Sequence, residues 1–171
     1  MDLVTLLKRP EVFRQFLIDS KKDCFEDLAK KDEVPSKYSK DFSREDLGLF
    51  STYKLCWDKL RHVRQQEIFL DEEVVWSMEI NGNIEPVVEA GLQKIKHAIN
   101  QAMLSPGRYI IPARGPLIAR LDDYNYTAST TEIEGKYDKI FNFVISEKLR
   151  RKLGKEVVYM AEILGRLLST E

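Results

Sequence analysis

The chain has 171 residues, of which 43% are hydrophobic and 32% are charged. This length fits a single domain, and the composition excludes a disordered or fibrous protein. The 27 basic and 28 acidic side chains nearly cancel, so attraction to nucleic acid or another polyanion would have to come from a local patch. No segment reaches the ~20 apolar residues of a membrane span, and we expect a cytoplasmic or other reducing intracellular location and no membrane partner.

The N-terminal part of the sequence predicts helices. Apolar residues recur at helical spacing from Pro10, which is favourable in a first helical turn, to about Lys30. A polar loop over 31–41 follows. A second helix is expected to start here, because Ser43 can serve as its N-cap and Asp46 follows three residues later.

A longer periodic segment runs from Leu47 to Ile80 and is interpreted as helix. Its inward row is Tyr53, Trp57, Leu60, Val63, Leu70, Val74 and Met78. The pair Asn81–Gly82 ends it, either as a helix C-cap or, in the alternative, as a hairpin turn after a strand with the sequence VVWSMEI. A further helix is expected after Pro86 and stops at Ser105-Pro106-Gly107.

The pattern changes beyond residue 107. Short runs rich in β-branched and aromatic residues, separated by turn formers, predict two or three strands between Arg108 and Ile145. After Ser146, apolar residues recur at helical spacing and predict a closing helix. They are Leu149, Leu153, Val157, Met160, Leu164 and Leu167. No internal repeat is apparent.

Together these elements predict an α+β fold in one domain over 1–171. We expect a helical body of about four helices over 1–104, a small antiparallel β-sheet over 105–145, and an amphipathic C-terminal helix over 146–171.

One stretch hints at chemistry. Asp122 and Asp123 precede the NYTAST segment, which is expected to form a turn, and Glu134-Gly135-Lys136 follows it. On a strand, residues two apart share a face, so Glu134 and Lys136 would project together. Carboxylates held in this way can bind the Mg²⁺ or Mn²⁺ ions that assist phosphodiester cleavage.

This arrangement resembles the signature of the PD-(D/E)xK nuclease superfamily over about fifteen residues. The resemblance implies a metal-dependent nuclease in which Asp123 and Glu134 bind Mg or Mn and Lys136 completes the catalytic set. The sequence departs from that pattern because Asp122 stands where proline is expected, and because Gly135 weakens the second strand. The alternative interpretation is a solvated polar hairpin with no metal and no cofactor.

A basic cluster marks the expected start of the last helix. It consists of Lys148, Arg150, Arg151, Lys152 and Lys155. Because cations are unfavourable at a helix N-terminus, another interaction is needed to explain them. Three explanations remain open: the cations form a solvated face, they bind phosphate groups of RNA or DNA, or they bind an acidic protein partner.

The sequence contains neither a phosphate-binding loop nor a cluster of cysteine and histidine with metal-ligand spacing. The leading hypothesis is therefore a non-enzymatic interaction subunit of a larger assembly that handles nucleic acid, with a protein partner or a second copy bound through the last helix. The metal-dependent nuclease is the alternative.

Overall fold

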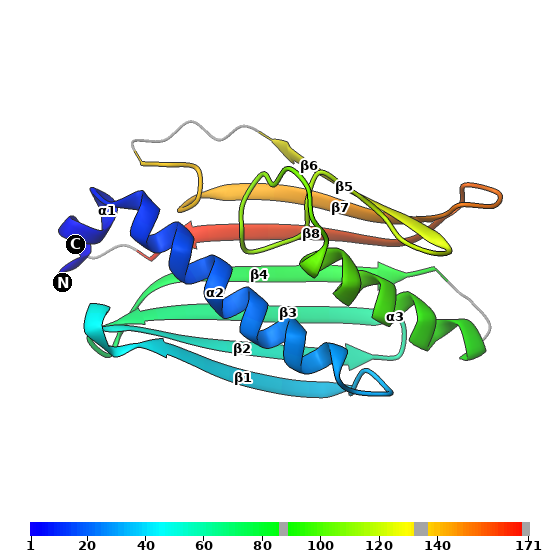
Figure 1. The fold of residues 1–171 in the computed structure, drawn as a ribbon, viewed down its shortest axis with the longest axis horizontal. Coiled ribbons are helices and arrows are strands. Elements are labelled where there is room, and N and C mark those ends of the chain that lie inside the picture. Colours follow the sequence, from blue (N-terminus) through cyan, green and yellow to red (C-terminus); the bar gives the residue numbers. More distant parts are fainter. Residues whose placement is uncertain (86–88, 132–136, 169–171) are drawn as a thin grey trace.

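The computed structural model describes residues 1–85, 89–131 and 137–168, and it is dominated by one antiparallel sheet. The eight strands are β1 (Lys37–Arg44), β2 (Leu49–Asp58), β3 (Arg61–Leu70), β4 (Glu73–Ile84), β5 (Ile118–Arg120), β6 (Tyr124–Thr131), β7 (Phe143–Arg151) and β8 (Val157–Leu167). They are arranged in the order β1-β2-β3-β4-β8-β7-β6-β5. The last strands of the two halves, β4 and β8, therefore pair in the middle (Figure 1).

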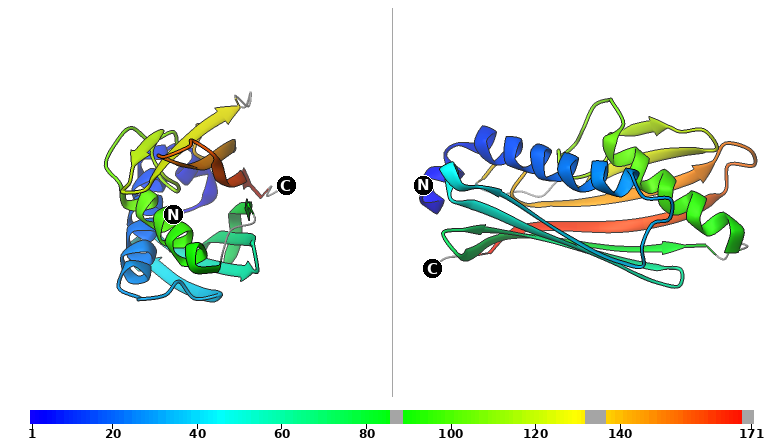
Figure 2. Two further views of the ribbon diagram at one scale, coloured as in Figure 1. Left: turned by 90° about the vertical axis from the view of Figure 1, so that its right-hand side faces the viewer. Right: turned by 60° about the horizontal axis from the view of Figure 1, so that its bottom comes forward.

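The helices lie on one face of this sheet (Figures 1 and 2). They are α1 (Leu3–Leu7), α2 (Pro10–Ala29) and α3 (Glu89–Leu104), and a short 3-10 turn, η1 (Glu45–Leu47), joins β1 to β2. Each half of the chain has the same element order, one long helix followed by four strands. No helix in the described part of the chain is both long enough and apolar enough to span a membrane.

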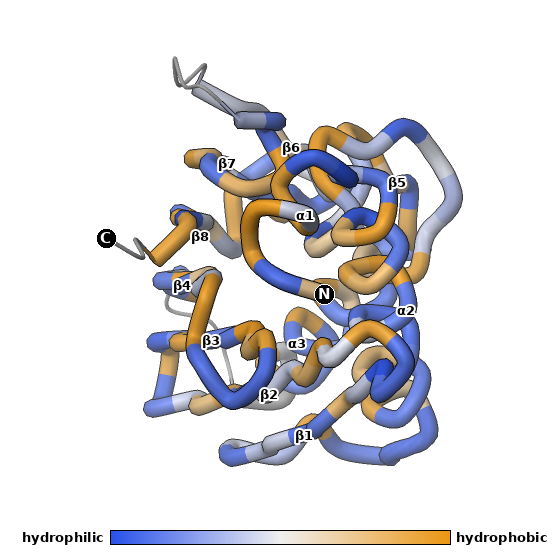
Figure 3. Tube along the Cα trace, turned by 90° about the vertical axis from the view of Figure 1, so that its left-hand side faces the viewer, coloured by the Kyte–Doolittle hydropathy of each residue, from blue (hydrophilic) through white to orange (hydrophobic). Residues whose placement is uncertain are grey.

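Figure 3 shows the helices and the sheet as two layers, and buried apolar residues of both layers, such as Phe13 on α2 and Trp76 on β4, belong to one core. Along β2, for example, residues alternate between buried and more exposed positions, as expected for a strand with one wet face. The other face of the sheet carries polar residues and a few apolar ones, among them Val63, Met160 and Leu164.

A loop covers the part of the sheet that the helices leave open. Residues 105–117 run from the end of α3 to β5 across the face of β6 and β7 that points toward the helices (Figure 1). Six consecutive loop residues, 111–116, are buried. A buried loop is uncommon because its backbone polar groups lose water, so this loop needs internal partners.

Two predicted helices are confirmed. The helix expected from Pro10 is α2, with Phe13, Phe16 and Leu17 buried against the sheet. The helix expected after Pro86 is α3, in which Ile95 and Ile99 are fully buried. Their apolar stripes were read correctly because the buried positions follow the helical period.

The predicted helical body is wrong, and with it the assignment to a helix-dominated α+β fold. The segment from Leu47 to Ile80 forms β2, β3 and most of β4 rather than a helix. Two-residue loops join these strands, and Asp71 and Glu72 in the second loop both have positive φ, as a type I′ turn requires. The alternative interpretation, in which VVWSMEI forms a strand, is correct for these residues because they lie in β4.

The predicted C-terminal helix over 146–171 is also wrong. Residues 143–167 form the β7–β8 hairpin. Of the apolar positions expected in one buried seam, Leu153 is 89% exposed and Met160 is 47% exposed, whereas Leu149 is buried. The helical spacing was accidental, because on β8 the buried positions are the alternate ones, Tyr159, Ala161 and Ile163.

Gly82 does not cap the end of a helix as one interpretation of the sequence predicted. It lies inside β4 on the covered face of the sheet, between the buried residues Ile80 and Ile84. A Cβ atom at this position would be 2.7 Å from the ring of Tyr159 and 2.8 Å from its hydroxyl oxygen. Glycine is therefore required because an aromatic ring occupies the space of its side chain.

Replacing Gly82 with alanine should destabilise the fold by about 1–3 kcal/mol, since the added methyl group forces Tyr159 out of position. Gly91 on α3 is the matched control, because a Cβ there meets nothing within 4 Å. Gly91→Ala should be neutral or stabilise by about 0.4–1 kcal/mol. Urea unfolding of both variants checks this, and equal effects would contradict the strand position of Gly82.

Candidate functional site

The basic cluster predicted from the sequence lies on the β7–β8 hairpin. Lys148 and Arg150 are on β7, Arg151 ends that strand, and Lys152 and Lys155 are in the turn. The whole cluster is at least partly exposed. There is no helix here, so the unfavourable helix-dipole interaction that singled out these cations does not exist, and any role for them must rest on their surroundings in the structure.

The hairpin forms one wall of a cleft of about 550 Å³ at this end of the molecule. The lining residues are Lys94, Asp122, Asp123, Tyr124, Arg151, Lys152 and Leu153. They come from α3, from the β5–β6 turn and from the β7–β8 hairpin. The Lys152 N–H donates to the Asp123 carbonyl oxygen at 3.0 Å, which holds the two turns together.

The cleft joins two sets of residues that the sequence placed in separate motifs. Asp122 and Asp123 belong to the proposed acidic hairpin, and Arg151 and Lys152 belong to the basic cluster. Among the described residues, none of the five cations of the cluster has a carboxylate within 4 Å. Leu153, at the tip, is the most exposed large apolar residue of the described part. The hairpin thus presents cations and an apolar side chain to solvent.

The predicted nuclease set is only partly described. Asp123 directly precedes β6, whereas Glu134 and Lys136 lie outside the described residues. NYTAST is not a turn but lies within β6, and this strand of eight residues spans on the order of 26 Å. No group of three potential metal ligands occurs among the described residues. The three-residue catalytic set and its Mg or Mn ion stay a prediction.

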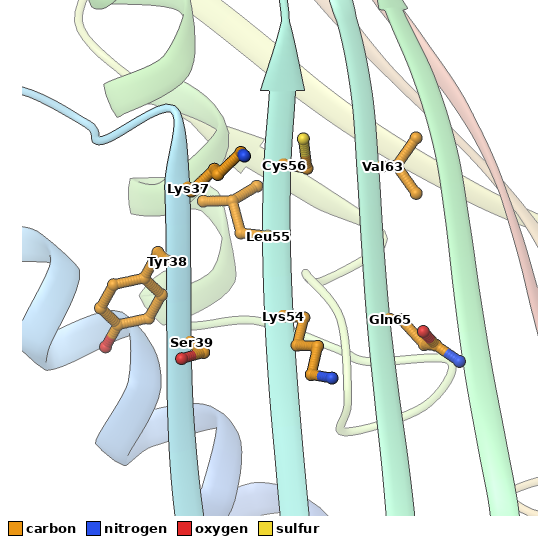
Figure 4. Close-up of a pocket in the computed structure, with 8 residues that line it drawn as sticks. All are labelled: Lys37, Tyr38, Ser39, Lys54, Leu55, Cys56, Val63 and Gln65. Carbon is orange, nitrogen blue, oxygen red and sulfur yellow. The ribbon is translucent and has the colours of Figure 1, made fainter.

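A second hollow, of about 510 Å³, lies at β1, β2 and β3 (Figure 4). Strand pairing aligns Lys37, Cys56 and Val63 in one row across it, and Ser39, Lys54 and Gln65 in the next. Cys56 is an exposed free thiol, and Cys24 on α2 is buried. Because this hollow follows the exposed side of a twisted sheet edge, its polar groups already contact solvent.

The covered face of the sheet contains a buried polar network centred on Glu147. Arg114 from the 105–117 loop forms a two-point ion pair with this carboxylate, and its Nε donates to Oε2 at 3.2 Å. Tyr126 on β6 donates to Oε2 at 2.7 Å, and Tyr159 on β8 donates to Oε1 at 3.0 Å. All four side chains are essentially inaccessible to solvent.

The network continues into the first half of the chain through His62 on β3. Arg64 Nε donates to His62 Nε2, so that nitrogen must be the acceptor and the ring proton lies on Nδ1. His62 Nδ1 then donates to the Tyr159 hydroxyl at 3.1 Å. An unbroken path of hydrogen bonds connects His62 through Tyr159 to Glu147.

Arg64 has only neutral partners. Its Nη1 donates to the Tyr53 hydroxyl and its Nη2 donates to Asn100 Oδ1, both at 2.8 Å. Its guanidinium also faces the ring of Phe25 at 5.2 Å, which stabilises a cation without supplying a counter-charge. Glu147, the one buried carboxylate in the described part of the chain, therefore pairs directly with Arg114 alone, and Arg64 has no carboxylate in contact with it.

Burial sets the protonation of these groups. Burial lowers the pKa of His62 well below its usual value, and the neighbouring Arg64, Arg114 and Lys96 lower it further. Burial, together with the Glu147 carboxylate, raises the pKa of Tyr126 and Tyr159 well above the usual range. At neutral pH the imidazole and both phenols are therefore uncharged, and the network is set to hold the loop rather than to exchange protons with solvent.

The sequence pattern did not reveal this network, because its members lie far apart in the chain. A usable signal existed, because Tyr126, Glu147 and Tyr159 each occupy an inward position in a strand where apolar residues alternate. A charged residue in such an inward row indicates a buried partner.

The comparisons with known proteins assign no family. No family model, no curated protein and no solved structure matches this chain. The functional interpretation therefore depends on the geometry alone.

Protonation of His62 should destabilise the fold. A second proton on the ring would oppose Arg64 Nε–H, so the folded state resists it while the unfolded chain accepts it near pH 6.5. Stability due to His62 is present above pH 6.5 and is lost as the pH falls below it. Between pH 7 and 5 the loss from this one group should be about 2 kcal/mol.

The test compares urea unfolding of the wild type and of His62→Gln at pH 7 and pH 5. Gln offers an acceptor to Arg64 but does not titrate. The wild type should lose about 2 kcal/mol more stability than the variant on acidification. Other acidic groups titrate in both proteins and cancel, so equal losses would show that His62 is protonated in the folded state.

Proposed function

We propose that this protein is a non-enzymatic interaction subunit that docks on an acidic protein surface through the β7–β8 hairpin. The observation that carries the proposal is the set of cations on this hairpin, which have no ion pair within the described structure, beside the exposed Leu153. The contact element is a β-hairpin rather than the helix expected from the sequence.

The charge arrangement supports a partner at this end. Cations without internal partners keep their full electrostatic attraction for an external anion, and they raise the association rate and the specificity of docking. Arg151 and Lys152 lie on the same cleft wall as Leu153, so a partner that binds there meets both charge and apolar surface. Protein interfaces combine such contacts, with an apolar centre and a polar rim.

A protein partner fits the cleft better than a nucleic acid does. Asp122 and Asp123 lie in the same cleft and repel phosphates and carboxylates alike, so charge alone does not choose between the two partners and Leu153 decides. An exposed leucine gives no hydrogen bond to phosphate or to a base edge, but it can enter an apolar pocket of a partner protein. An acidic protein segment with apolar residues can contact both the cations of the hairpin and Leu153.

Reversing the charge of Arg151 and Lys152 should abolish binding of an acidic peptide. The ligand is a labelled peptide of alternating Glu and Leu residues, measured by fluorescence anisotropy at 50 and 200 mM salt. Arg151→Glu/Lys152→Glu should lose binding at both salt concentrations, and Leu153→Ser should weaken it about tenfold at either. Lys30→Glu/Lys31→Glu, an exposed pair at the end of α2, is the matched control and should bind as the wild type does.

A single-stranded oligonucleotide of equal charge serves as the competing ligand. The proposal predicts weak oligonucleotide binding that disappears at 200 mM salt and does not depend on Leu153. Tight oligonucleotide binding that is insensitive to Leu153→Ser would contradict the proposal and favour a nucleic-acid-binding module. Equal loss in the control pair would also contradict it, because net charge alone would then explain the result.

A further inference from the structure

A separate pocket lies on the helical side of the molecule, away from the basic hairpin. Its volume is about 440 Å³, within the range of small-molecule sites. It is enclosed by α2, by the end of α3 and by the 105–117 loop. The lining residues are Arg14, Ile18, Lys21, Lys22, Glu26, Met103, Leu104, Tyr109 and Pro112.

The walls of this pocket are largely apolar. Ile18 on α2, Leu104 on α3 and Pro112 in the loop contribute apolar surface from three directions. Leu104 is 38% exposed although it is a large hydrophobic residue near packed neighbours. Apolar groups of this kind gain free energy when a ligand covers them.

Lys21 supplies a charged group at the pocket wall. Its ammonium donates to the Arg114 carbonyl oxygen at 3.0 Å and lies over the Tyr109 ring, 4.1 Å from the centroid. An ammonium has three N–H donors, so these contacts leave it able to bind a ligand. No carboxylate lies within 4 Å of it among the residues that the structure describes.

The rim charges are also mainly positive. Arg14 and Lys22 have only long ion pairs, of 3.9 Å with Asp138 and 3.8 Å with Glu26. The pocket lining therefore contains three cations and one carboxylate. Charge and shape together select a ligand with an anionic head and an apolar body.

We infer that this pocket binds a small amphipathic carboxylate, with the carboxylate on Lys21 and the alkyl or aryl part against Ile18, Leu104 and Pro112. The site is preformed, because the loop that carries Tyr109 and Pro112 is anchored beneath the pocket by the Arg114–Glu147 ion pair. This inference is independent of the proposed docking hairpin. Either can fail while the other holds.

A series of ligands with one tail and three head groups tests the inference. The probes are 4-phenylbutyrate, 4-phenylbutanol and 4-phenylbutylammonium, titrated into the ¹⁵N- and methyl-labelled protein and followed by NMR. The carboxylate should shift the signals of Ile18, Leu104 and Tyr109 and bind at least tenfold more tightly than the alcohol. Equal affinity for the alcohol, or shifts confined to other residues, would overturn the inference.

Lys21→Gln provides the matched variant, because the amide still donates to the Arg114 carbonyl but carries no charge. It should weaken 4-phenylbutyrate at least tenfold and leave 4-phenylbutanol unchanged. Lys30→Gln, at an exposed lysine that caps the end of α2 outside this pocket, should have no effect. If Lys21→Gln fails to fold, the head-group series on the wild type still decides the question. Unchanged carboxylate affinity in a folded Lys21→Gln would overturn the inference.

The pH dependence gives an independent readout. Burial, reinforced by the charge of Arg114, lowers the pKa of Lys21 to about 8. Three other charged groups around the pocket, Arg14, Lys22 and Glu26, lie on the exposed side of α2, and burial raises the pKa of Tyr109 so that it stays neutral. Affinity for 4-phenylbutyrate should fall about tenfold from pH 7 to pH 9 in the wild type and stay constant in Lys21→Gln. Parallel behaviour of the two proteins would assign the binding to another group.

Discussion

The ion pair between Arg114 and Glu147 is the constraint on which the rest of the structure depends. It ties a loop without regular secondary structure to the middle of β7, in a place with no access to water. Burial opposes the charge on Arg114, and the carboxylate of Glu147 outweighs that opposition and raises the pKa of the guanidinium. Because two charges are expensive to bury, such a pair specifies one arrangement of the loop more than it adds stability.

The same carboxylate joins the two halves of the chain. Each half consists of a long helix and four strands, and the sequence shows no repeat between them. Hydrogen bonds from Tyr126 and Tyr159 on β6 and β8 meet at Glu147, and Tyr159 connects them to His62 on β3. Glycine at position 82 leaves space for the Tyr159 ring between the central strands. The network therefore fixes how the two halves share one sheet.

The two proposed binding surfaces lie around this buried centre. The basic hairpin extends from β7, the strand that carries Glu147, and the Lys21 pocket is closed by the loop that carries Arg114. The loop that carries Tyr109 and Pro112 is anchored by the ion pair of Arg114 with Glu147, so the pocket is formed before a ligand binds. Preorganised sites of this kind bind with a smaller loss of conformational entropy.

The helices could be predicted from the sequence because their buried positions follow a strict period, as Phe13, Phe16 and Leu17 do in α2. The strands could not, because the inward row of β3 contains His62, Arg64 and Gln66, which hide the apolar alternation. On β7, Glu147 has the same effect. Polar residues of the buried network thus weakened the strand pattern of β3 and β7 without removing it.

Of the candidate site, the sequence identified the five cations of the hairpin but placed them on a helix. It could not bring Asp123 next to Lys152, because their contact depends on the pairing of β6 with β7. The sequence did not identify Lys21 as a binding residue, since a lysine on an amphipathic helix is normally solvated. Only the tertiary structure shows which segments that are far apart in the chain lie close together in space.

A double-mutant cycle on Arg114 and Glu147 tests the central claim most directly. The free energy of unfolding is measured for the wild type, Arg114→Met, Glu147→Met and the double variant. Each single substitution leaves one buried charge unpaired and should cost about 3–5 kcal/mol, whereas the double variant should lose far less than their sum, with a coupling of about 2 kcal/mol or more. Costs that add, with a coupling below about 0.5 kcal/mol, would contradict the account.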